Sequence, residues 1–112
     1  MDTAVTEAQF QSKLIKLLKT HPLLKDAIIW KVSDRFGGGR PDLQIILNGE
    51  TTYFELKVAP GWLSKLQEYY LKKIGRRAHL VTHFPNSGMT SVDAVYCSRI
   101  TLAVEKMAAL CL

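Results

Sequence analysis

Two acidic residues, Asp42 and Glu55, and a lysine, Lys57, have the types and spacing expected for metal-assisted hydrolysis of a phosphodiester bond. Two carboxylates held close together repel, and one keeps its proton unless a cation neutralises the pair. A hard divalent ion such as Mg²⁺ prefers oxygen ligands and keeps water molecules that can act as the nucleophile. Lys57 can orient or deprotonate that water and stabilise charge on a phosphate. This chemistry requires a fold that brings the three side chains to one surface.

The sequence around these residues predicts a β-hairpin. Two apolar, β-prone runs, residues 43–47 and 51–58, flank the dipeptide Asn48-Gly49. This dipeptide is a strong signal for a two-residue type I′ turn, because both positions of that turn need a positive φ. A turn at Asn48 and Gly49 fixes the strand register, so that the numbers of paired residues sum to 97.

That register gathers the reactive side chains on one face of the hairpin. Asp42 falls opposite Glu55, and opposed side chains have Cβ atoms about 4.5–5.5 Å apart, close enough to share one cation. Side chains alternate along a strand, so Lys57 shares the face of Glu55. Three apolar side chains point to the other face: Phe54, Leu56 and Val58.

A helix is predicted before the hairpin. Thr3 or Thr6 can cap it, and it runs to about Thr20, because residue 21 precedes a proline and avoids the α region. Its apolar positions have helical spacing: Phe10, Leu14, Leu17 and Leu18. Glu7 extends this inward stripe, and an acidic residue is also favourable at a helix N-terminus. Residues 27–32 then form a short predicted strand, and a polar, glycine-rich loop covers residues 33–40.

A second helix is predicted from about Leu63 to Ile74, after the strand break at 59–61. Gln67 lies within its apolar stripe, where its amide needs hydrogen-bond partners such as backbone groups. Gly75 fits the C-terminal cap of this helix. A strand at 78–83 follows, then a loop at 84–91, a short strand at 92–96 and a terminal helix that Ser98 can cap. His79 and His83 lie roughly 13 Å apart along a strand, too far for a shared zinc ion.

This order of elements predicts an α/β fold in one domain, residues 1–112. Its centre is a mixed β-sheet of four to five strands flanked by helices. The length of 112 residues suffices for a hydrophobic core without disulfide or metal staples. Cys97 and Cys111 have no metal-ligand or redox spacing and are expected to be free thiols. With no leader pattern and no run long enough to span a membrane, a cytoplasmic protein is expected.

The motifs resemble a known nuclease superfamily. Pro41-Asp42 followed by Glu55-Leu56-Lys57 is similar to the PD-(D/E)xK signature. The Gly-Arg-Pro-Asp lead-in and Gln67 narrow the resemblance to the VRR-NUC branch, which is similar to stand-alone phage nucleases and Holliday-junction resolvases. The resemblance covers roughly Glu7 to His83, and it implies a restriction-endonuclease-like core.

The resemblance also implies an activity and roles for individual residues. A metal-dependent DNA endonuclease is expected, phage-encoded and acting in the host cytoplasm, that leaves a 5′-phosphate and a 3′-hydroxyl. Mg²⁺ or Mn²⁺ is expected on Asp42 and Glu55, with the Leu56 carbonyl and Glu7 completing the site. For Glu7, the favourable position at the helix N-terminus remains the alternative account. Lys57 is expected to orient or activate the water, and Gln67 to position it or the scissile phosphate.

The charge balance favours a polyanionic partner such as DNA. The chain has 15 Lys and Arg against 10 Asp and Glu, a formal net charge of +5. The basic residues predicted to contact the DNA backbone are Arg35, Arg40, Lys65, Lys72, Lys73, Arg76 and Arg77. A solvated helix face has much the same composition as the group around the second helix.

Three alternatives concern the substrate and the class of function. A resolvase that cuts a symmetric four-way junction needs two sites, which implies a homodimer. A flap nuclease or a general duplex nuclease is compatible with a monomer. A non-catalytic DNA-binding or inhibitor protein on a nuclease fold is the alternative from another class. The clustered Asp42 and Glu55 argue against it, because a module that only binds DNA has little use for carboxylates facing the phosphates.

Overall fold

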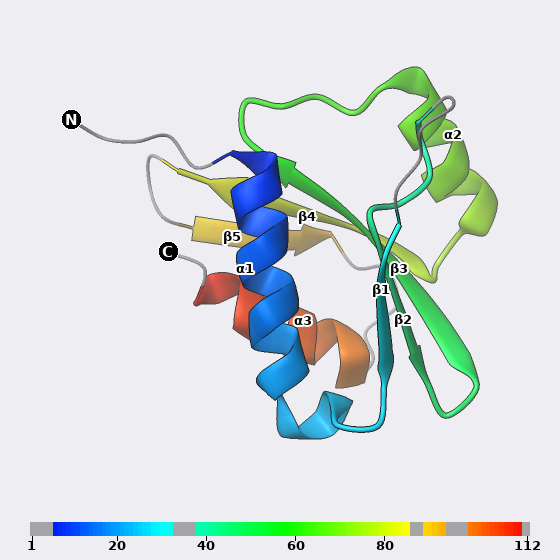
Figure 1. Cartoon of the computed structure of the whole chain (residues 1–112). Helices are drawn as coiled ribbons and strands as arrows, with labels where there is room; N and C mark the ends of the chain where they lie inside the picture. The colour runs from blue at the N-terminus through cyan, green and yellow to red at the C-terminus, as the bar shows by residue number, and fades with distance from the viewer. Residues whose placement is uncertain (1–5, 33–37, 86–88, 94–98, 111–112) are drawn as a thin grey trace.

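The computed structural model describes residues 6–32, 38–85, 89–93 and 99–110 (Figure 1). Its elements, in chain order, are α1 (Glu7–Thr20), the 3₁₀ turn η1 (Pro22–Leu24), β1 (Ile28–Lys31), β2 (Leu43–Leu47), β3 (Glu50–Val58), α2 (Lys65–Ile74), β4 (Ala78–Phe84), β5 (Met89–Asp93) and α3 (Arg99–Ala109).

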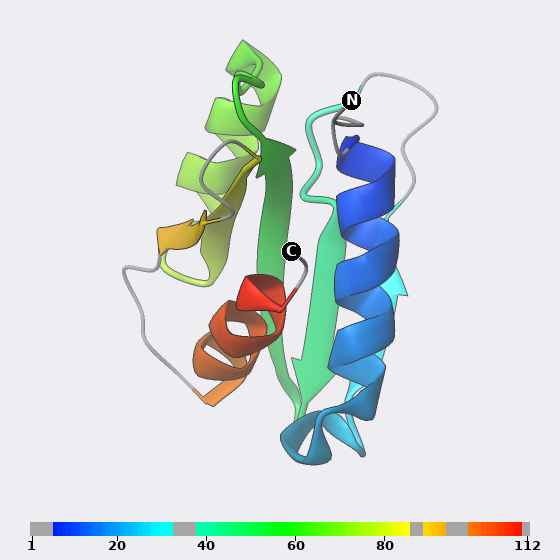
Figure 2. The same ribbon diagram turned by 90° about the vertical axis from the view of Figure 1, so that its left-hand side faces the viewer.

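These strands form one mixed sheet in the order β1-β2-β3-β4-β5. Strands β3 and β4 are parallel, and the other neighbouring pairs are antiparallel. Parallel neighbours need a long crossover, and the segment that contains α2 supplies it. Helices α1 and α2 lie on opposite sides of the sheet (Figure 2). The predicted mixed α/β architecture with four to five strands and flanking helices is therefore confirmed.

The hairpin of β2 and β3 has the register that its turn predicts. Pairing runs from Leu47 opposite Glu50 to Leu43 opposite Phe54, and every pair sums to 97. The turn residues Asn48 and Gly49 have φ values of 53° and 78°, as a type I′ turn requires. Asp42 directly precedes β2, so the same register continues to place it across from Glu55.

The core lies between the sheet and the helices α1 and α3. Thr6 caps α1, because its hydroxyl accepts a hydrogen bond from the Gln9 backbone N–H at 3.1 Å; the other predicted cap, Thr3, lies outside the described residues. The buried stripe of α1 meets one face of the hairpin. The buried hydrophobic residues of these two elements are Phe10, Leu14, Leu18, Leu43, Ile45, Phe54 and Leu56. This packing buries the apolar face of the hairpin. The opposite face, which carries Glu55, packs against α2.

Both histidines of β4 are core residues. His79 and His83 are 1% and 2% exposed. The ring of His79 packs 5.3 Å from that of Phe54, and the ring of His83 stacks 5.3 Å from that of Phe10. Burial, together with the charge of Lys13, lowers the pKa of His83. Both imidazole rings therefore contribute to the packing of the core, and the absence of a shared zinc ion stays a prediction.

Several predicted boundaries were wrong. Helix α2 begins at Lys65 rather than Leu63, because Ser64 caps it. The predicted loop at 84–91 is largely a hairpin, in which Phe84 pairs with Met89 and β5 ends at Asp93. Strand β1 spans four residues rather than 27–32. Ser98, Cys97 and Cys111 lie outside the described residues. Within the described chain, no helix is both long and apolar enough to cross a bilayer.

Candidate active site

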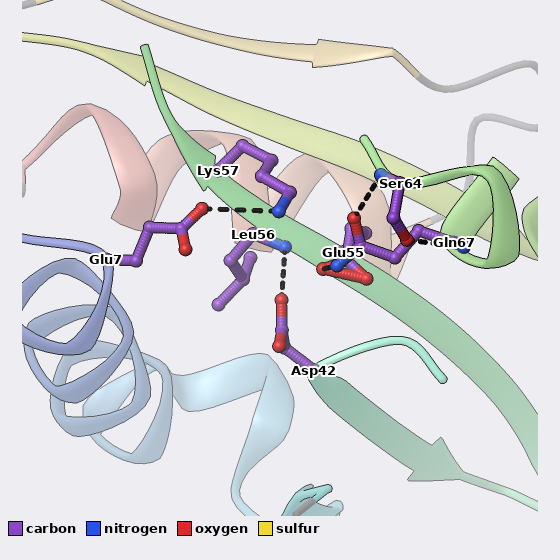
Figure 3. Close-up of polar contacts among 7 residues, drawn as sticks. All are labelled: Glu7, Asp42, Glu55, Leu56, Lys57, Ser64 and Gln67. Atoms are coloured by element: carbon purple, nitrogen blue, oxygen red, sulfur yellow. Dashed lines mark hydrogen bonds and ion pairs between the residues drawn. The ribbon is translucent and has the colours of Figure 1, made fainter. Parts of the chain in front are cut away.

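Asp42 is fixed by the backbone of the neighbouring strand. Its Oδ2 accepts a hydrogen bond of 2.9 Å from the Leu56 N–H (Figure 3). The hairpin register explains this bond, since Asp42 faces Glu55 and its short side chain reaches the next peptide group of β3. A carboxylate that accepts a backbone N–H is oriented without a long, flexible partner. The second oxygen of Asp42 remains available toward Glu55.

Glu55 is a carboxyl group buried beside another carboxyl group. Its side chain is 1% exposed, and Oε1 is buried with no hydrogen-bond partner among the described residues. Burial, then the hydrogen bond and charge of Asp42, and to a smaller extent the charge of Glu7, together raise the pKa of Glu55 from 4.5 to about 9, although Lys57 opposes the shift. Without a cation, Glu55 therefore stays protonated at neutral pH. A buried carboxyl oxygen without a partner is costly unless something else binds there.

Lys57 is held by Glu7. Its Nζ lies 3.5 Å from Glu7 Oε1, and the Lys57 side chain is only 12% exposed. Glu7 Oε1 is itself buried and makes no hydrogen bond within the described chain, so this ion pair is its polar contact there. The first turn of α1, which carries Glu7, thus lies beside the end of β3, which carries Lys57 (Figure 3). A low exposure of this kind limits the positions that the ammonium group can take.

The predicted four-ligand metal set is only partly assembled. Asp42 and Glu55 come together as predicted, but no group of three or more His, Cys, Asp or Glu side chains suited to a metal ion occurs in the described residues. Glu7 is directed at Lys57, which sequence reasoning did not foresee. Its role as a ligand, like that of the Leu56 carbonyl, stays a prediction.

Gln67 joins α2 to the acidic pair. Its Oε1 accepts from the Ser64 N–H at 2.8 Å, and its own N–H donates to Ser64 Oγ at 3.1 Å, which makes a capping box. Its Nε2 lies 3.4 Å from Glu55 Oε2. Gln67 therefore has both a backbone partner and a partner in the site. Sequence reasoning missed Ser64, although Ser-x-x-Gln ahead of an apolar stripe is a recognised helix-start signal.

Gly39 allows the loop that carries Asp42 to lie close to α2. Its φ is +96°, and a Cβ at this position would lie 2.5 Å from Leu66 Cγ in α2. Only glycine fits such a conformation and such a close contact without strain. The loop therefore packs directly on α2 two residues before the buried Pro41 and three residues before the half-buried Asp42.

The predicted DNA contacts are distributed unevenly. Arg35 lies outside the described residues. Arg77 is half-buried, with its Nη2 3.7 Å from Glu50 Oε1 at the hairpin turn. The remaining basic residues are exposed: Arg40, Lys65, Lys72, Lys73 and Arg76. Lys65 directly follows Ser64 at the end of α2 nearest Glu55, while Lys72, Lys73 and Arg76 lie at the other end. Whether they bind DNA stays a prediction.

The donor atoms fit a hard divalent cation. Asp42 and Glu55 offer only carboxylate oxygens, the ligand type that Mg²⁺ and Mn²⁺ prefer. A cation at Glu55 Oε1 would satisfy the buried oxygen and favour the ionised form of the acid. Asp42 and Glu55 are the residues that would hold it.

Comparisons with known proteins add no relative. No family model, no curated protein and no solved structure matches this chain. The function is therefore inferred from the geometry of the site together with the resemblance of its motifs.

The two roles of Gln67 can be separated by comparing it with Ser64. Ser64→Ala removes only the cap, and we expect a loss of about 1 kcal/mol in unfolding free energy with DNA cleavage retained. Gln67→Ala removes its side of the capping box and the contact to Glu55, so cleavage is expected to fall as well. Thermal unfolding and a cleavage assay on both variants measure this. Equal cleavage by the two variants would confine Gln67 to a structural role.

Proposed function

We propose that this protein is a metal-dependent DNA endonuclease with a restriction-endonuclease-like core. The observation that carries the proposal is the pairing of Asp42 with Glu55, whose buried Oε1 has no hydrogen-bond partner in the described chain. A protein gains no stability from burying one carboxyl group against another without a counter-charge. The same strand supplies Lys57, and this trio matches the motif that the sequence resembles.

The order of elements supports the core assignment. A helix is followed by three antiparallel strands, then by a helix that crosses to a parallel fourth strand. This is the order that the resemblance implies, with Asp42 before the second strand and Glu55 in the third. Strand β5 and helix α3 then follow, in the part of the chain that the motifs do not cover.

Each residue of the trio has a defined task. Asp42 and Glu55 bind the cation, with Asp42 oriented by the Leu56 N–H and Glu55 by Gln67. When bound, Mg²⁺ or Mn²⁺ would lower the pKa of a coordinated water, and its positive charge would stabilise the negative charge on the phosphate. Lys57, restrained by Glu7, orients the attacking water and donates a hydrogen bond to the charged phosphate oxygens.

The alternative of a non-catalytic DNA-binding or inhibitor protein accounts less well for these features. Binding to phosphates requires basic groups, whereas Asp42 and Glu55 are acidic side chains that offer a phosphate no attraction. The hydrogen bond that fixes Asp42 and the restraint of Lys57 by Glu7 would contribute only to stability in such a protein, whereas in a nuclease they also orient the reacting groups.

A panel of end-labelled DNA substrates tests the proposal. Four-way junction, flap, linear duplex and single-stranded DNA are incubated side by side with Mg²⁺, Mn²⁺ or EDTA. We expect metal-dependent cutting of at least one substrate, and a loss of at least about a hundredfold in rate in Lys57→Ala. Paired symmetric cuts in the junction would indicate a dimeric resolvase, and cuts in several substrates a broader nuclease. Binding without any cutting would favour the non-catalytic alternative.

A further inference from the structure

A pocket of about 280 Å³ opens beside the acidic pair, between the hairpin and α2. Its wall includes Arg40 and Pro41 from the loop before β2, Gln44 and Tyr53 from the hairpin, and Tyr70 and Ile74 from α2. None of the roles proposed above uses Gln44, Tyr53 or Tyr70. The volume approaches the lower end of the range found for small-ligand pockets.

The pocket lies on the same face of the sheet as the acidic pair. Gln44 pairs with Tyr53 across the hairpin, and the Asp42–Glu55 pair is the next one along on that face. Tyr53 precedes Glu55 by two residues, which is about 7 Å at about 3.3 Å per residue. A group bound in the pocket would therefore lie close, along the strand, to a phosphate cut at the acidic pair.

The lining suits a flat, partly polar aromatic ligand. Tyr53 and Tyr70 offer ring faces or edges, and Pro41 and Ile74 add apolar surface. The Gln44 side chain provides one hydrogen-bond donor group and one acceptor at the wall, a combination that pairs with the edge of a nucleobase. Arg40 adds positive charge at the wall, as a nucleotide phosphate requires.

Aromatic side chains continue beyond the pocket. Trp30 pairs with Gln44 from the edge strand β1, so it shares the same face of the sheet, and it is 54% exposed. Tyr69 is 53% exposed, and its ring lies edge-on to Tyr70 at 5.5 Å between centroids. Aromatic side chains interleaved with basic ones are typical of surfaces that bind single strands.

We propose that this pocket binds one unpaired nucleobase of the DNA strand, next to the phosphate that is cut. The proposal rests on the proposed nuclease function for the source of the strand, but base binding itself does not require cleavage. A base inside a continuous duplex cannot reach the pocket without leaving its stack, which costs energy. The protein therefore selects DNA with unpaired nucleotides at the cut site, such as flaps, gaps and open junction centres, over uniform duplex.

Binding of a short single-stranded DNA oligonucleotide that carries one 2-aminopurine tests the pocket. The assay uses the full chain with Glu55→Gln in EDTA, so that nothing is cut, and follows quenching of the fluorescent base. We expect quenching, and about tenfold weaker binding in Tyr70→Ala, the loss typical of removing one stacking ring. Tyr70→Phe keeps the ring and should bind as the parent does. Leu102→Ala changes an exposed side chain on α3, on the other side of the sheet, and should do the same.

A second variant tests the pocket independently, in case Tyr70→Ala does not fold. Gln44→Leu keeps the size of the side chain and removes its amide, and it is expected to weaken binding several-fold. Unquenched fluorescence, or unchanged affinity in a folded Tyr70→Ala or in Gln44→Leu, would overturn the pocket assignment even if the wild-type protein cuts DNA. Quenching that depends on Tyr70 and Gln44 would support it even if no substrate is cut.

Discussion

Replacing Asp42 with asparagine is expected to slow DNA cleavage by at least about a hundredfold while leaving the fold intact. The amide oxygen of asparagine can still accept the 2.9 Å hydrogen bond from the Leu56 N–H, so the loop before β2 keeps its anchor. What is lost is the negative charge that holds the cation. Glu55→Gln removes the other charge and is expected to have the same effect. The measurement is the cleavage rate of end-labelled DNA in saturating Mg²⁺.

Glu50→Gln provides the matched control. Glu50 lies on the same strand, but at the hairpin turn, where it pairs with Arg77 at 3.7 Å. Exposed ion pairs contribute little to stability, so this variant should fold and cut as the wild type does. A wild-type rate in Asp42→Asn or in Glu55→Gln would remove the acidic pair from the mechanism. A similar loss in Glu50→Gln would show that the assay responds to general charge rather than to the site.

In EDTA, Glu55→Gln is expected to be more stable than the wild type at pH 8 and about equally stable near pH 4.5. The folded protein keeps a proton on Glu55, because burial and Asp42 raise its pKa to about 9, whereas the unfolded chain releases it above about 4.5. The folded state binds more protons, so its stability falls as pH rises through this window. Glutamine has no proton to lose. We expect its melting temperature at pH 8 to exceed that of the wild type by at least about 4 °C.

Mg²⁺ should narrow this difference in stability. A ligand that binds only the folded protein at about 100 times its Kd stabilises it by about 2.7 kcal/mol. We therefore expect a clear rise in the melting temperature of the wild type and little change in Glu55→Gln. Thermal unfolding of both proteins from pH 4.5 to 8.5, with EDTA or with Mg²⁺, gives the comparison. A wild type that melts as the variant does at every pH, and does not respond to Mg²⁺, would contradict a cation site at Glu55.

The hairpin was predictable because local chemistry determines it. Asn48 and Gly49 specify the turn, the turn specifies the register, and the register places Asp42 across from Glu55. The apolar stripe of α1 was predictable for a similar reason, since helical spacing alone identifies Phe10 and Leu14 as core residues.

Contacts between distant segments were not predictable in the same way. The ion pair of Lys57 with Glu7 depends on where the start of α1 lies beside the end of β3, and no local pattern encodes that position. The pocket beside Tyr53 likewise exists only because α2 packs over the hairpin through Tyr70. Strand β5 was misplaced because Pro85, Asn86 and Gly88 predict a loop but do not specify the residue at which the next strand begins.

The most direct test of the central claim is a single assay of metal dependence and product chemistry. Protein stripped with EDTA is mixed with end-labelled DNA, Mg²⁺ or Mn²⁺ is added back, and the ends of the products are identified. We expect no cleavage before metal addition and, afterwards, products with 5′-phosphate and 3′-hydroxyl ends. Cleavage that persists in EDTA, or products with 3′-phosphate ends, would contradict the assignment of Asp42 and Glu55 as the cation site of a nuclease.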